Sequence, residues 1–278
     1  MLTTARLQRM NHGSRFRAFT LRGDRHAKPI DPFLGVDHAW ISGPTFPAHP
    51  HAGFSAVSYL FMDSQTGIDN QDSLGNRNLI QPGGLHWTAA GNGVVHEEVP
   101  AEPGKTVHML QIFINLPEDK QSQAPFAFSV ESQEVPVVHS PGVKVRVPLG
   151  SFHNVVSPLS LPTDVRLLDI SLEAGRELSV SIPEGHLAFV MPIDGEVSVD
   201  GHPFDLSDPK VPVNLPQGAD RRVTLSAPTG NAKAVVFSGT PLNQPVHWQG
   251  PMALASSEAL TAAVARYQRG DFGNLNLR

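Results

Sequence analysis

Glycine and proline interrupt this chain at short intervals, and they restrict its fold more than any other feature of the sequence. The 278 residues include 24 glycines and 25 prolines, spread without a repeat period. These residue types end helices and form turns, so their density is typical of many short strands joined by turns. Hydrophobic residues make up 40% of the chain, which is enough to fill one large core or two smaller ones. We therefore expect an all-β fold.

Two stretches of alternating sequence indicate two β-rich halves. Residues 106–116 place leucine and isoleucine on one face with the period of two that a half-buried strand requires. In the second half, Asp200-Gly201 lies between two alternating runs and predicts a tight hairpin. Prolines and polar residues gather between residues 117 and 145, where we expect the boundary between two β-sandwiches or barrels.

The end of the chain has a different pattern, which predicts one amphipathic helix. Its apolar residues recur at the spacing of a helix face, at Leu260, Ala263, Val264 and Tyr267. Ser256 or Ser257 is the expected N-cap, and Gly270 is the expected stop.

The charge and the lack of cysteine exclude several classes of protein. The formal net charge is -5 and no basic patch occurs, so direct binding of nucleic acid is not expected. No segment is long and apolar enough to span a membrane or to form a signal-peptide core, which predicts a cytoplasmic protein. Because the chain has no cysteine, nitrogen and oxygen ligands must hold any metal.

Two short motifs carry the ligands for such a metal. In His49-Pro50-His51 both imidazoles lie on one face of an extended chain, because side chains alternate along a strand. In His96-Glu97-Glu98, which follows a glycine-rich turn, His96 and Glu98 share a face in the same way. An isolated His-x-His often arises by chance or caps a loop, but two such pairs can converge inside a small barrel.

Three imidazoles and one carboxylate favour a first-row divalent metal. Magnesium and calcium prefer oxygen ligands, whereas a mixed nitrogen and oxygen set suits Fe, Mn, Ni, Cu or Zn. Four protein ligands on an octahedral ion leave positions open for water, O2 or a substrate. The pattern therefore predicts one transition metal with open positions, which implies catalysis or ligand sensing.

The sequence resembles the pirin family, whose members are bicupins of the cupin superfamily. The matching motifs run in order along nearly the whole chain: Asp31-Pro32-Phe33-Leu34, Asp37-His38, His49-Pro50-His51-Ala52-Gly53-Phe54, Asp72-Ser73-Leu74-Gly75-Asn76-Arg77, Pro82-Gly83-Gly84, residues 88–100, Leu110-Gln111, Asn115-Leu116-Pro117 and residues 250–273. The resemblance implies two tandem jelly-roll-like cupin barrels with a short C-terminal α-helix.

The resemblance also implies the domains and the metal site. Residues 1–135 would form a metal-binding cupin barrel, residues 136–250 a cupin barrel without metal, and residues 251–278 a helix and tail that pack on the barrels. In pirins the metal, usually iron, is held by the residues that correspond to His49, His51, His96 and Glu98. Spacing and resemblance select the same four residues.

Three positions depart from the common pirin pattern. Ala52 replaces an arginine, Ser55 replaces a glutamate, and Asn70 replaces a histidine. We expect Ser55 to share the strand face of His49 and His51, so that its exchange alters the surroundings of the metal.

The remaining histidines have structural roles in this interpretation. His38 is expected to be a hydrogen-bonded structural residue and His86 a wall or rim residue. The other histidines without a partner at ligand spacing, expected at the surface or in packing, are His108, His139, His153, His186, His202 and His247.

The resemblance favours a metal-dependent dioxygenase that acts on a flavonol such as quercetin with O2. Glu98 would then serve as a ligand and as the base for the flavonol hydroxyl. The first alternative is a non-catalytic metal-binding regulator that acts through a protein partner in transcription or metabolism. A third hypothesis is zinc-assisted hydrolysis or isomerisation.

Overall fold

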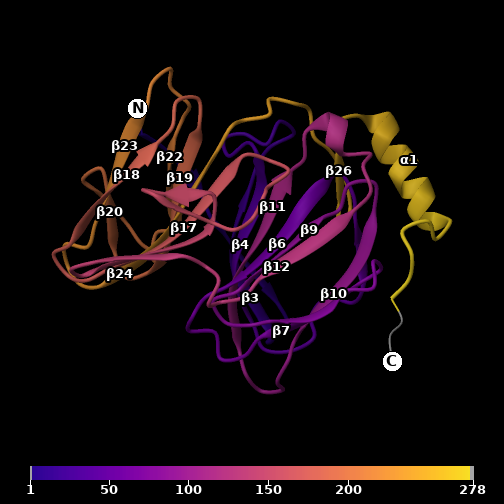
Figure 1. The fold of residues 1–278 in the computed structure, drawn as a ribbon, viewed down its shortest axis with the longest axis horizontal. Coiled ribbons are helices and arrows are strands. Elements are labelled where there is room, and N and C mark those ends of the chain that lie inside the picture. Colours follow the sequence, from indigo (N-terminus) through magenta and orange to yellow (C-terminus); the bar gives the residue numbers. More distant parts are fainter. Residues whose placement is uncertain (1, 276–278) are drawn as a thin grey trace. The chain divides into compact units, whose positions relative to one another are not determined.

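The computed structural model describes residues 2–275, which divide into two compact units (Figure 1). The unit that contains residues 9–28, 32–133 and 242–275 is named here the N-terminal barrel. The unit that contains residues 2–8, 29–31 and 134–241 is the C-terminal barrel. That segments 1–135, 136–250 and 251–278 fold as separate domains stays a prediction.

The N-terminal barrel consists of a seven-stranded and a four-stranded antiparallel sheet and one hairpin. The large sheet has the order β12 (Phe126–Val130), β9 (Leu85–Ala89), β6 (Phe54–Leu60), β11 (Val107–Asn115), β4 (Phe33–Ile41), β3 (Phe16–Arg22), β2 (Gln8–His12). The small sheet has the order β5 (His49–His51), β10 (Val94–Pro100), β7 (Ile68–Asp72), β8 (Arg77–Ile80). The hairpin pairs β25 (His247–Gln249) with β26 (Met252–Leu254), and a 3-10 turn η1 covers Glu118–Lys120.

The C-terminal barrel repeats this plan. Its seven-stranded sheet has the order β1 (Leu2–Arg6), β22 (Lys210–Asn214), β19 (Leu187–Asp194), β24 (Ala232–Gly239), β17 (Val165–Leu172), β14 (Val143–Leu149), β13 (Val137–Ser140). Its four-stranded sheet has the order β18 (Glu177–Ile182), β23 (Arg221–Ser226), β20 (Val197–Val199), β21 (His202–Phe204), and β15 (Ser151–Phe152) pairs with β16 (Val155–Val156). The predicted all-β fold with two tandem barrels is confirmed.

The predicted hairpin lies between β20 and β21. Val199 pairs with His202, so Asp200-Gly201 forms a two-residue loop. Both loop residues have positive φ angles, 49° and 82°, as the hairpin turns that match strand twist require.

The predicted terminal helix is α1 (Ser257–Gln268). The Ser256 side chain accepts a hydrogen bond from the backbone of Ala259 at 3.1 Å, so Ser256 is the N-cap. Leu260 and Ala263 are buried, Val264 is partly buried, and Tyr267 is exposed.

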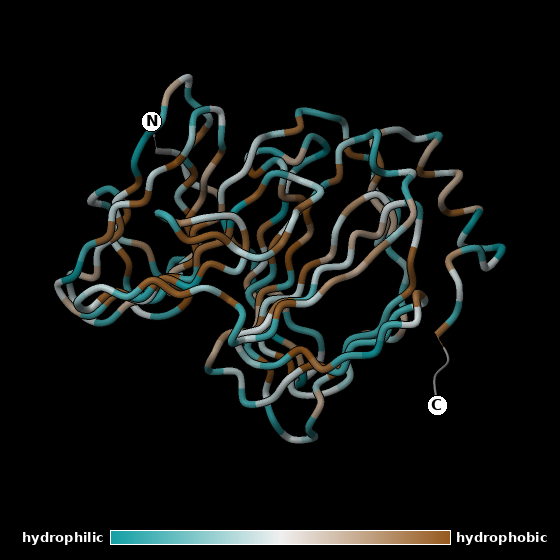
Figure 2. Tube along the Cα trace, viewed as in Figure 1, coloured by the Kyte–Doolittle hydropathy of each residue, from teal (hydrophilic) through white to brown (hydrophobic). Residues whose placement is uncertain are grey.

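The two barrels differ in what fills them. Both sheets of the C-terminal barrel contribute to one large apolar core that includes Ile170, Val180, Val199 and Val223. In the N-terminal barrel the strands β7 and β10 are largely hydrophilic (Figure 2). The interior of that barrel therefore holds polar groups.

Candidate metal centre

Three histidines of the N-terminal barrel point their ring nitrogens at one another. Strand β5 pairs with β10 so that His49 lies opposite His96, and His51 lies opposite Val94. The Nε2 atom of His96 lies 3.0 Å from Nε2 of His51 and 3.1 Å from Nε2 of His49. One ligand atom from each ring lies within 4.8 Å of the others, so this triad forms a group that could hold a metal ion.

Backbone carbonyls orient two of the three rings. Nδ1 of His49 lies 2.9 Å from the oxygen of Pro47, and Nδ1 of His51 lies 3.1 Å from the oxygen of Pro251. A carbonyl can only accept, so Nδ1 carries the ring proton in both residues and Nε2 keeps its lone pair. The Nε2 lone pairs of His49 and His51 both face Nε2 of His96, where a cation could accept all three nitrogens. The donor set thus fits a transition metal.

Burial keeps the triad in the neutral form that binds metals. It lowers the pKa of His51 to about 3 and the pKa of His96 well below its usual value, and it also lowers the pKa of His49. The histidines are therefore uncharged at neutral pH, and a metal ion need not displace protons from them.

Glu98 lies in the same barrel but is turned towards Ser58 of β6. The Ser58 hydroxyl lies 2.8 Å from each carboxylate oxygen of Glu98 and donates to that group. Burial raises the pKa of Glu98 to about 7, although the hydrogen bond from Ser58 opposes this rise. The structure thus gathers three of the four predicted site residues into one group. Ligation of a metal by Glu98 stays a prediction.

The Glu98 carboxyl is connected to a polar row across the large sheet. Ser58 lies opposite Gln111 in the strand pairing, and its hydroxyl is 3.1 Å from Gln111 Oε1. Gln111 in turn lies opposite Asp37, and Ser58 lies opposite His86 on its other side. Directly opposed residues share a face, so these side chains all face the interior. The sequence reasoning missed Ser58 and Gln111, for which polar residues in otherwise apolar strands were the available signal.

Ser55 does not share the face of the triad, so that prediction is wrong. A positive φ of 84° at Gly53 turns the chain between β5 and β6, and a Cβ there would collide with the carbonyl of Ala253. The strand alternation restarts after this turn. Ser58 then faces Glu98, and Ser55, three residues earlier, faces the other side of the sheet.

The other two departures from the pirin pattern also have structural contacts. Ala52 is buried in the apolar cluster under helix α1. Asn70 donates a hydrogen bond to Nε2 of His86 at 3.2 Å, and Nδ1 of His86 lies 2.8 Å from the Ser129 hydroxyl. His86 is buried, which lowers its pKa to about 4, so it is an interior wall residue rather than a rim residue.

A cavity of about 260 Å³ lies between the two sheets of the N-terminal barrel, beside the triad and Glu98. Much of its wall is apolar, from Met10, Phe16, Ile41, Phe46, Ile68 and Phe113. Arg22 and Asp37 add an ion pair to the wall. The cavity can accept a small, largely apolar molecule with polar groups at its ends.

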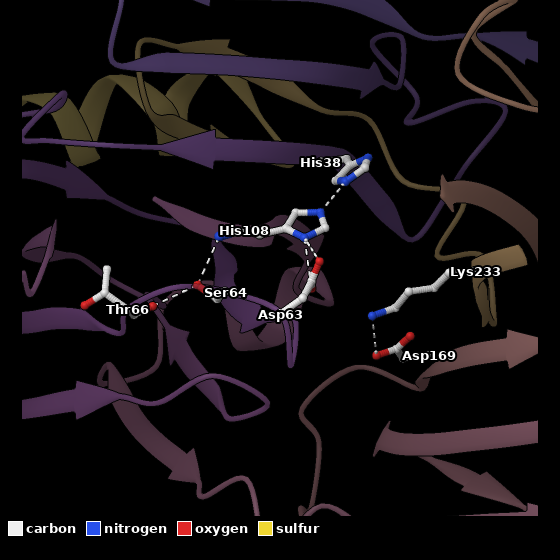
Figure 3. A network of polar contacts seen from close by, with 7 residues as sticks. All are labelled: His38, Asp63, Ser64, Thr66, His108, Asp169 and Lys233. Atoms are coloured by element: carbon white, nitrogen blue, oxygen red, sulfur yellow. Dashed lines mark hydrogen bonds and ion pairs between the residues drawn. The ribbon is translucent and has the colours of Figure 1, made fainter. Parts of the chain in front are cut away.

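Figure 3 shows a second histidine cluster, in which His38 and His108 lie beside Asp63. Neither of these histidines is among the residues that line the cavity. Nε2 of His38 lies 2.7 Å from Nε2 of His108, and Nδ1 of His108 lies 3.0 Å from both Asp63 oxygens. His38 follows the cavity residue Asp37 on β4 and so points to the opposite face. His38 is hydrogen bonded, as predicted. His108 was predicted as a surface or packing residue, and it is a buried residue whose ring packs against Trp40 and Phe61. Its hydrogen bonds in this network were not predicted, because sheet pairing brings its partners from distant parts of the chain.

A histidine cluster enclosed between the two sheets of one barrel, followed by a second barrel of the same plan, defines a bicupin. The chain belongs to the pirin family. A family model described as Pirin matches residues 3–114, and one described as Pirin C-terminal cupin domain matches residues 167–273.

Relatives match over most of their length. Pirin-1 of Arabidopsis thaliana is 30% identical over 272 residues, covering 97% of this chain and 92% of that protein. Pirin of Homo sapiens is 30% identical over 255 residues, covering 90% and 86%.

Among solved structures, a quercetin 2,3-dioxygenase from Acinetobacter baumannii superimposes with a TM-score of 0.86 at 25% identity and covers 98% of this chain and 97% of its own. The Escherichia coli pirin YhhW, solved in complex with nickel(II), shares the fold with a TM-score of 0.67 at 16% identity and covers 87% of this chain and 100% of its own. Within residues 2–275, no helix combines the length and the apolar character needed to cross a membrane.

Proposed function

We propose that this chain is a metal-dependent dioxygenase that uses O2 to cleave a flavonol such as quercetin. His49, His51, His96 and Glu98 would hold one divalent transition metal, and iron is our first choice for this metal. The observation that carries the proposal is the convergence of three Nε2 atoms at the wall of an apolar cavity. The A. baumannii structure described as a quercetin 2,3-dioxygenase supports the choice of reaction.

The metal would supply open coordination positions and redox chemistry for O2. The protein supplies the orientation of its ligands through the carbonyls of Pro47 and Pro251. Manganese, nickel, copper and zinc also suit this ligand set.

Glu98 is the residue that we propose to take the proton of the substrate hydroxyl. Glu98 lines the cavity beside the triad, so its carboxylate can reach the hydroxyl of a bound substrate. Ser58 holds the carboxyl in place through the two 2.8 Å contacts. The apolar wall formed by Phe16, Phe46 and Phe113 would hold the aromatic rings and exclude water.

Metal analysis and oxygen uptake test this function. The purified protein should contain one metal per chain, and the form loaded with iron should consume O2 when quercetin is added. Forms loaded in turn with Fe, Mn, Ni and Cu that consume no oxygen would contradict the dioxygenase. That result would favour the alternative of a metal-binding regulator.

A further inference from the structure

Arg22 lies at the end of β3 and forms a two-pronged ion pair with Asp37. Its Nη1 is 2.6 Å from Asp37 Oδ1, and its Nη2 donates to Oδ2 at 2.8 Å. Nη1 also donates to the backbone oxygen of Leu21 at 3.0 Å. Asp37 is nearly buried, whereas the Arg22 side chain is 39% exposed. The ion pair therefore fixes the plane of the guanidinium without covering it.

One edge of the Arg22 guanidinium stays available. A guanidinium has N–H donors on both Nη atoms and on Nε. Nη1 donates to the Leu21 oxygen and contacts Asp37 Oδ1 as an ion pair, and Nη2 donates to Asp37 Oδ2. Among the described residues Nε has no hydrogen-bond partner, and Nε and Nη2 lie side by side on one edge of the planar group. Two parallel donors on one plane match two neighbouring oxygen acceptors.

The Arg22 group belongs to the candidate substrate cavity. Arg22 and Asp37 line the same cavity as the histidine triad. The guanidinium carbon lies 5.7 Å from the ring centroid of Phe113, another wall residue. Among the described residues that line the cavity, Arg22 is the only lysine or arginine.

We propose that Arg22 is a specificity-determining residue that binds two neighbouring oxygen atoms of an aromatic substrate through this edge. A carboxylate or a catechol would supply such a pair. The proposal rests on the proposed function only in taking this cavity as the substrate site. Asp37 is a positioning residue, because it orders the guanidinium before a ligand arrives and so reduces the entropy cost of binding.

Paired probes of equal shape test this inference. Calorimetry without oxygen measures binding of two probe pairs to the metal-loaded protein. The first pair is 2-naphthoate, which has two neighbouring oxygens, and 2-naphthamide, which has one. The second pair is 2,3-dihydroxynaphthalene, which has two neighbouring oxygens, and 2-naphthol, which has one. The wild type should prefer at least one probe with the oxygen pair by about tenfold. Arg22→Gln should abolish that preference, and the probe pair affected identifies carboxylate or catechol as the source.

Arg17→Gln is the matched control. Arg17 lies on the same strand but on the opposite face, with its guanidinium carbon 4.4 Å from the ring centroid of Trp40, so its loss should leave the preference unchanged. A preference that survives in Arg22→Gln, or no preference in the wild type, would overturn the proposal. Survival would mean that the metal or another group binds the oxygen pair.

Two further measurements cover a variant that does not fold and separate this inference from the proposed function. If Arg22→Gln fails to fold, a crystal structure of the wild type with the preferred probe decides the question, since its oxygens should lie against Nε and Nη2 of Arg22. Metal content and oxygen uptake are recorded on the same samples, and binding is repeated after removal of metal by a chelator. If the protein binds no metal or consumes no oxygen with quercetin, the proposed function fails, but the probe preference due to Arg22 should remain. If the probe preference is absent, the inference about Arg22 fails, but metal content and oxygen uptake should remain.

Discussion

The two barrels have the same plan, but their interiors differ: the N-terminal barrel encloses a cavity beside its histidines, whereas the C-terminal barrel contains an apolar cluster built by both of its sheets. Each consists of a seven-stranded and a four-stranded sheet. In the C-terminal barrel the small sheet contributes Val180, Val199 and Val223 to an apolar core. In the N-terminal barrel the small sheet contributes the histidine triad and Glu98, which border a cavity. The two barrels thus differ in a few interior residues, which are apolar in the packed C-terminal barrel and polar in the N-terminal barrel with the candidate site.

This difference has an energetic cost. Buried imidazoles and carboxyls lose hydration and need compensating hydrogen bonds, whereas valine and isoleucine gain free energy on burial. The polar row through Ser58 and Gln111 supplies part of that compensation. The core cluster of the C-terminal barrel is built from hydrophobic side chains, whose burial contributes favourable free energy.

The largest expected effect concerns the metal itself. The double variant His51→Ala/His96→Ala should lose nearly all bound metal, because two of three converging nitrogens are removed. Elemental analysis measures the content. His139→Ala, an exposed histidine of the C-terminal barrel, is the control and should keep one metal per chain. Equal metal content in the double variant and the wild type would refute the assignment.

Core truncation should distinguish the two interiors. Ile170→Ala in the packed core should lower the free energy of unfolding by about 4 kcal/mol, because it opens a new void. Ile68→Ala should cost only about 2 kcal/mol, because Ile68 already borders a cavity and loses fewer contacts. Urea unfolding followed by circular dichroism gives both values. Equal losses would show that the cavity does not weaken packing around it.

Glu98→Gln should separate turnover from binding. The amide keeps the shape of the side chain but is a poor base and a poor ligand, so turnover with quercetin should fall about 100-fold while flavonol affinity changes little. Oxygen uptake and anaerobic titration measure the two quantities. Glu177→Gln on the C-terminal barrel should change neither. A parallel loss of binding and turnover would argue against a role of Glu98 as base.

The smallest effect is a pH dependence of stability in the metal-free protein. The unfolded chain ionises Glu98 near its ordinary pKa of 4.5, whereas the folded protein keeps the proton until a pKa of about 7. The folded state therefore binds more protons in this window, and its stability falls as pH rises from about 4.5 to about 7. Glu98→Gln removes this effect.

Relative to Glu98→Gln, the metal-free wild type should lose about 2 kcal/mol of unfolding free energy between pH 5 and pH 7. Thermal or urea unfolding after chelator treatment checks the difference. A constant gap across this range would mean that Glu98 is ionised in both states.

The sequence determined the features that depend on neighbouring residues. Alternation along a strand put the histidines of His-x-His on one face, Asp200-Gly201 formed the hairpin turn, and Ser256 capped the helix. These features follow from backbone geometry and short-range hydrogen bonds, which act over a few residues.

Only the tertiary structure decided which groups meet across the barrel. The carbonyl of Pro251 orients His51 from 200 positions away, and Asp37 pairs with Arg22 across two strands. The turn at Gly53 put Ser58 rather than Ser55 beside Glu98, and sheet pairing gave His108 its buried partners. Closure of the sheets set these contacts, because strand register and barrel curvature depend on the packing of the whole chain rather than on any local pattern.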